Sequence, residues 1–151
     1  MLERVRAASV AVDTKPGEIA ENLRKIDQWS GRAKADGAQL VLFQELSLCG
    51  FIPNHPIGDH SAWLREALRI AGQIAEPIPG SATDALVAIA AKHNLLVCAG
   101  LLEEAGPVLH NTQVLVTVLQ TLKGIFGDEG DDDLWEGAHA FNVRAALGKG
   151  K

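Results

Sequence analysis

Apolar and polar residues alternate along the chain in blocks that predict strands and helices in turn. Residues 5–13 and 39–43 are short apolar runs bounded by turn residues, a pattern typical of buried strands. Between them, residues 18–36 repeat apolar positions at helical spacing, with charged residues on the other face. Strand, helix and strand joined by short turns form a βαβ unit, so we expect the two strands to be parallel neighbours.

The same alternation continues further along the chain. Residues 49–59 contain two prolines and two glycines, which predict a loop. Two further helices and two further strands are expected over residues 61–75, 81–93, 95–99 and 111–119. Ser81 is the expected N-cap of the second of these helices, and Gly106-Pro107 is the expected turn between the strands. Strands that alternate with helices predict an α/β fold.

The pattern changes after residue 123. Residues 124–138 contain four glycines and six acidic residues, and no clear period follows them. We therefore predict a folded unit over residues 1–123 and an acidic, glycine-rich tail of low order over residues 124–151. One short element is expected within that tail, near residues 141–147.

Composition narrows the possible classes of protein. The chain has 151 residues, of which 47% are hydrophobic and 22% charged, and this composition favours a globular domain over a disordered chain. A net charge of -5 without a basic cluster argues against nucleic-acid binding. No apolar run is long enough for a membrane span and no signal peptide is visible, so the expected location is the cytoplasm. Neither a metal-ligand spacing nor a glycine-rich phosphate loop is present, and no cofactor is expected.

The residue with the clearest chemical potential is Glu45. It follows the apolar run 39–43, at the carboxyl end of a predicted strand, which is the edge where open α/β sheets assemble their sites. Apolar neighbours on both sides predict partly dry surroundings, which suit a general base. From the residues alone, a solvent-facing or capping acid remains the alternative.

The segment Leu42-Phe43-Gln44-Glu45-Leu46-Ser47-Leu48-Cys49-Gly50-Phe51 resembles the first signature of the carbon–nitrogen hydrolase (nitrilase) family. Gln44 stands where that family most often has proline. The resemblance continues in order through Ile78-Pro79-Gly80-Ser81, Val97-Cys98-Ala99-Gly100 and His110-Asn111-Thr112, and covers about the first 118 residues. It implies a partial nitrilase-like α-β-β-α sandwich.

The resemblance also implies roles for individual residues. In the family a glutamate takes the proton of a cysteine thiol, the thiolate attacks an amide or nitrile carbon, and a lysine stabilises the developing charge. Glu45 matches the glutamate, and Lys123 is the nearest match to the lysine, with a surface lysine beside a loop as the alternative. No cysteine follows residue 98, so the family nucleophile is missing from this chain. Cys49 and Cys98 are more typical of buried small residues.

Two functions follow from these observations. The first is a hydrolase of non-peptide carbon–nitrogen bonds, acting on a small-molecule amide or nitrile by the Glu-Lys-Cys mechanism, with self-association into a homo-oligomer as in the family. The second is a catalytically inactive, truncated paralogue that acts as a binding or assembly partner. The missing cysteine favours the second reading for the isolated chain.

Overall fold

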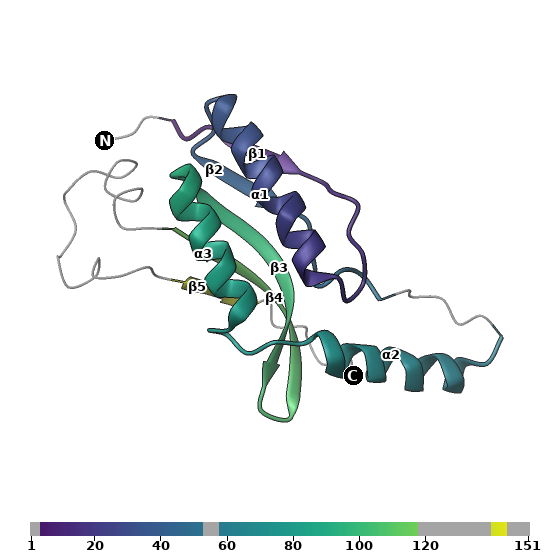
Figure 1. The fold of residues 1–151 in the computed structure, drawn as a ribbon. Helices are drawn as coiled ribbons and strands as arrows, with labels where there is room; N and C mark the ends of the chain where they lie inside the picture. The colour runs from purple at the N-terminus through teal and green to yellow at the C-terminus, as the bar shows by residue number, and fades with distance from the viewer. Residues whose placement is uncertain (1–3, 53–57, 118–139, 145–151) are drawn as a thin grey trace.

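A computed structural model of the chain describes residues 4–52, 58–117 and 140–144. Figure 1 shows its elements along the chain. The helices and strands are β1 (Ala7–Val10), α1 (Ile19–Ala35), β2 (Leu40–Phe43), α2 (His60–Ile74), α3 (Ser81–His93), β3 (Leu96–Ala105), β4 (Val108–Val116) and β5 (Ala140–Arg144). The predicted alternation of strands and helices is therefore confirmed.

The strands form one mixed sheet in the order β1-β2-β3-β4-β5. β1 pairs with β2 in parallel, as the βαβ pattern predicted, and β2 pairs with β3 in parallel. β4 runs antiparallel to both β3 and β5. Because β1, β2 and β3 run in the same direction, their carboxyl ends meet at one edge of the sheet, where Glu45 follows β2.

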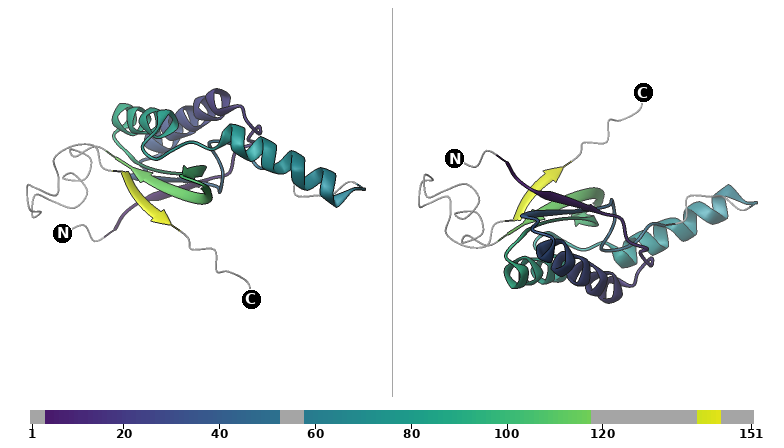
Figure 2. Two further views of the ribbon diagram at one scale, coloured as in Figure 1. Left: turned by 90° about the horizontal axis from the view of Figure 1, so that it is seen from below. Right: turned by 90° about the horizontal axis from the view of Figure 1, so that it is seen from above.

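Helices α1 and α3 lie side by side on one face of the sheet (Figure 2). The main core fills the space between this helix layer and the sheet, because apolar residues of strands β1 to β4 alternate toward the helices. Its largest fully buried apolar side chains are Ile26, Val41, Leu48, Leu86, Leu95, Val97, Leu101, Val114 and Val116.

The opposite face of the sheet is covered by no helix among the described residues (Figure 2). Leu96 packs there against Leu40 and Leu115 in a small separate apolar cluster. Leu42, the next residue of β2 on that face, is 38% exposed. The described part of the chain thus has one helix layer and one sheet, which is half of a four-layer sandwich.

Helix α3 begins differently from the prediction. Its N-cap is Gly80 and not Ser81, so the predicted cap residue was wrong by one position. The hydroxyl of Thr83 accepts from the Gly80 backbone N–H at 2.8 Å, and the carboxylate of Glu76 accepts from the Ala82 N–H at 2.8 Å. The side chains of Thr83 and Glu76, and not that of Ser81, therefore accept from the N–H groups at the start of the helix.

Helix α2 projects from the body of the molecule (Figure 1). Its buried residues are Ala71 and Ile74, both in its last turns, whereas Leu64 and Leu68 are 43% and 61% exposed. Asp59 caps its first turn by accepting from the N–H groups of Ser61 and Ala62. Within the described ranges, no helix combines the length and the apolar character that crossing a membrane requires.

Polar side chains of Asp27, Lys92 and His93 join α1 to α3. The carboxylate of Asp27 accepts from the Lys92 ammonium at 2.7 Å and lies 2.7 Å from the Nε2 atom of His93. These contacts, above all the hydrogen bond from Lys92, hold the pKa of Asp27 below its ordinary value. A carboxyl group with a lowered pKa in the folded state stabilises the fold above its unfolded-state pKa, and this contribution is lost as the pH falls through the folded-state pKa.

We therefore expect Asp27→Asn to lower the free energy of unfolding at neutral pH by about 1 kcal/mol or less, because the pair is partly exposed to solvent. The difference between the two proteins should shrink as the pH falls below about 4. Urea unfolding of both proteins at a series of pH values measures it. A difference that stays constant into strong acid would contradict the prediction.

Candidate active site

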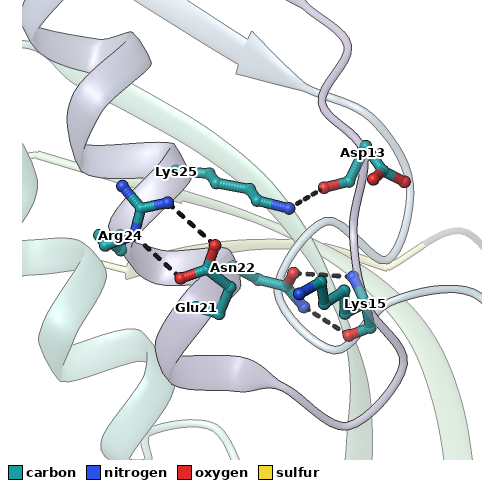
Figure 3. Close-up of polar contacts among 6 residues, drawn as sticks. All are labelled: Asp13, Lys15, Glu21, Asn22, Arg24 and Lys25. Carbon is teal, nitrogen blue, oxygen red and sulfur yellow. Dashed lines mark hydrogen bonds and ion pairs between the residues drawn. The ribbon is translucent and has the colours of Figure 1, made fainter.

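Two loops meet at the carboxyl edge of the sheet, and Asn22 joins them. Asn22 lies in the second turn of α1 and is fully buried. Its Oδ1 atom accepts from the Lys15 N–H at 2.9 Å, and its Nδ2 atom donates to the carbonyls of Lys15 at 2.9 Å and Leu48 at 3.0 Å. Figure 3 shows the pair of bonds to Lys15, with Lys25 bonded to the carbonyl of Asp13 beside it. One side chain thus fixes the loop after β1 against the segment after β2.

Gln44 extends the pairing of β1 and β2 beyond the end of both strands. Its Oε1 atom accepts from the Val12 N–H at 3.1 Å, and its Nε2 atom donates to the Val12 carbonyl at 2.5 Å. The side chain therefore gives the backbone after β1 the partner that the backbone of β2 no longer supplies. The residue that departs from the proline of the family has a structural role at this edge of the site.

The chain turns sharply after Glu45. Leu46 has a positive φ of 50°, and the turn that it forms returns the chain to β3. There the hydroxyl of Ser47 accepts from the Gly100 N–H at 3.0 Å, and the Leu48 N–H donates to the Gly100 carbonyl at 2.9 Å. Ser47 and Leu48 are fully buried, so the residues after Glu45 form the anchored part of the loop.

Glu45 itself is exposed, and the prediction of partly dry surroundings is wrong for the described residues. The reason is the turn at Leu46, which buries the following residues and leaves the glutamate on the outer side. The carboxylate is nevertheless held, because the Nδ2 atom of Asn111 on β4 donates to its Oε1 atom. In the sequence, Asn111 begins the predicted strand 111–119 and lies in the family-like segment His110-Asn111-Thr112, but neither observation indicated Glu45 as its partner.

The chain's two cysteines are poor candidates for a nucleophile. Cys49 is 1% exposed, and burial raises the pKa of its thiol. Cys98 is half-buried in β3, and burial raises the pKa of its thiol as well. A catalytic cysteine needs the opposite shift, because the thiolate is the reacting form. Both side chains fit the reading of small apolar residues.

Lys123, the other predicted catalytic residue, lies outside the described residues. The site that the structure describes therefore consists of the Glu45 carboxylate, its amide partner on β4 and the anchored loop between them. Among the residues of the three described ranges, no group of three or more His, Cys, Asp and Glu side chains is placed to hold a metal ion.

The chain matches known proteins at the level of family and fold. The sequence pattern of the carbon–nitrogen hydrolases matches residues 6–126. An amidase from Nesterenkonia sp. is similar in structure, with 27% sequence identity and a TM-score of 0.54. That match covers 74% of this chain and 37% of the amidase. A second structure, of the NitN amidase after removal of its tag, gives 25% identity, a TM-score of 0.56 and coverage of 74% and 39%.

The match spans most of the chain, and the chain therefore belongs to the carbon–nitrogen hydrolase family. Its α/β architecture is that of a partial nitrilase-like sandwich, as the resemblance implied. The chain spans less than two-fifths of the length of the amidase structures that it matches. No sequence among curated proteins matches it significantly.

Proposed function

We propose that this chain contributes the general base of a hydrolase for non-peptide carbon–nitrogen bonds, with a small-molecule amide or nitrile as substrate. The observation that carries the proposal is the place of Glu45, which follows the central parallel strand β2 at the carboxyl edge of a family sheet. The similar Nesterenkonia structures are amidases, and one of them carries the acetamide moiety of fluoroacetamide covalently at its active site cysteine.

The chemistry divides among three groups. Glu45 takes the proton of a cysteine thiol, and the sulfur forms a bond to the amide carbon as the carbonyl π electrons move to oxygen. Lys123 is the cation that stabilises this oxyanion. Glu45 then gives its proton to the amide nitrogen, so that the C–N bond breaks, ammonia leaves and a thioester forms. Water hydrolyses the thioester, with the Glu45 carboxylate again as base. Cys49 and Cys98 are the only cysteines of this chain, and burial raises the pKa of both thiols, which disfavours them as this nucleophile. Ammonia release by the isolated chain would therefore require one of them to act despite its burial.

Ammonia release tests the proposal. The purified chain is incubated with a panel of short amides and nitriles, beside the variants Glu45→Gln and Lys123→Met. We expect each substitution to lower the rate at least about 100-fold, because each removes a group that acts in the transition state. Glu104→Gln is the matched control, since Glu104 is an exposed glutamate of β3 and takes no part in the scheme. Activity that survives in Glu45→Gln would contradict the role of that residue.

A second function is favoured by one observation, the apolar face of the sheet that no helix of the described residues covers. We propose it as the alternative: a catalytically inactive family member that acts as a binding or assembly partner. Apolar surface of this kind is typical of interaction sites. A folded chain that releases no ammonia from any substrate would support this function and exclude the hydrolase for the isolated chain.

A further inference from the structure

Two amide side chains on β4 reach the end of β2, although β3 lies between these strands. Asn111 donates from Nδ2 to the Oε1 atom of Glu45. Gln113 donates from Nε2 to the carbonyl of Phe43 at 3.3 Å. Residues two apart in a strand point to the same face of a sheet, so both amides lie on one side of β4. They contact the side chain of Glu45 and the last residue of the strand that precedes it.

The amides can span β3 because residue 100 is a glycine. Gly100 is the register partner of Gln113 on β3. A Cβ atom on Gly100 would lie 2.6 Å from the Oε1 atom of Gln113 and 2.4 Å from the backbone nitrogen of Leu46. The space above this glycine is therefore filled by Gln113 and by the turn that follows Glu45. Strand β3 thus presents no side chain that would separate β4 from the Glu45 segment at this point.

An exposed glutamate needs such support if it is to act as a base. A free glutamate side chain samples several rotamers, and a general base must lie within hydrogen-bond reach of the proton that it takes. A donor on Oε1 restricts those rotamers and leaves Oε2 available. The carbonyl of Phe43 is fixed in the same way by Gln113, so the backbone from which Glu45 projects is held as well.

We propose that Asn111 is a positioning residue that orients the Glu45 carboxylate so that Oε2 is the proton-accepting atom, with Gln113 holding the end of β2. The kinetic consequence of this assignment rests on the proposed hydrolase function. The contact between the two side chains does not, and it can be tested in the chain whether or not the chain turns over a substrate.

The contact is tested by NMR of the side-chain amide groups. The ¹⁵N–¹H signals of Asn111 are recorded across the acid range in the wild-type chain and in Glu45→Gln. We expect the Asn111 signals to shift with pH along a single carboxyl titration in the wild type, and to stay constant in the variant. Glu104→Gln is the control and should leave the titration intact. Signals that do not respond to pH in the wild type, or that still respond in Glu45→Gln, would overturn the proposal.

The positioning role is tested by kinetics on the same amide panel. Asn111→Leu keeps the approximate size and removes the donor, and Asn111→Asp keeps the shape and replaces the donor by a carboxylate. We expect kcat to fall about 10- to 100-fold in both, with KM changed less than about twofold, because orientation and not substrate binding is lost. An unchanged kcat in folded variants of an active wild type would overturn the role. An inactive wild type would refute the hydrolase function, and the NMR titration would then decide the contact alone.

Discussion

Replacing Asn22 by alanine is expected to lower the free energy of unfolding by about 2–4 kcal/mol. The side chain is fully buried and makes three hydrogen bonds to backbone groups of Lys15 and Leu48. Alanine removes all three bonds, and it leaves the buried carbonyl of Leu48 without this partner. The cost of a buried polar group without a partner is larger than the net gain from a normal hydrogen bond, which is why the expected effect is large.

Urea unfolding of Asn22→Ala against the wild type measures this effect. Gln28→Ala is the matched control, because Gln28 lies on the exposed face of the same helix and alanine favours helix there. We expect the control to change stability by less than about 0.5 kcal/mol. An Asn22→Ala protein as stable as this control would contradict the prediction, because the hydrogen bonds of Asn22 would then contribute little to the stability of the two loops.

Replacing Gly100 by alanine is expected to cost about 2–3 kcal/mol and to displace the Glu45 segment. The added Cβ would meet the backbone nitrogen of Leu46 at 2.4 Å and the backbone carbon of Glu45 at 3.1 Å. These are backbone atoms, so no side-chain rotation can relieve the contact. The turn after β2 must move away from β3, and the hydrogen bonds that Ser47 and Leu48 make to Gly100 must lengthen.

Gly72→Ala provides the opposite control. Gly72 lies within α2, and a Cβ atom there would meet nothing within 4 Å. Alanine should therefore stabilise the protein by up to about 1 kcal/mol through helix propensity. Thermal unfolding of the two variants should move in opposite directions from the wild type. If both variants destabilise the protein alike, the close approach at Gly100 is not the cause of the lower stability of Gly100→Ala.

The regular part of the fold could be predicted because local pattern and tertiary structure agree there. The apolar run 39–43 forms β2, and the amphipathic segment 18–36 forms α1 with the expected buried face. The extent of β3 could not be predicted. Its apolar run suggested residues 95–99, but the strand continues to Ala105 because β4 pairs with it along that length. Glu103 is buried in this extension, where the hydroxyl of Thr112 donates to its carboxylate at 2.7 Å.

Of the candidate site, the sequence predicted the position of Glu45 but not its surroundings. The place of Glu45 at the end of a parallel strand follows from the order of the elements. Its environment depends on the turn at Leu46 and on Asn111, which is 66 residues away along the chain. A contact at that separation requires the antiparallel register of β3 and β4. The pattern of apolar residues predicts that strands form, but not which residues of two strands pair. The partner of the glutamate was for this reason visible only in three dimensions.

The exposed position of α2 has a consequence for how the molecule opens. Since only its last turns are buried, the first turns of this helix can unwind without loss of contacts in the core. The free energy of that local opening is therefore much smaller than the free energy of global unfolding, and approaches that of a single helix in water. The sheet, α1 and α3 are therefore expected to unfold together, whereas the first turns of α2 can open without them.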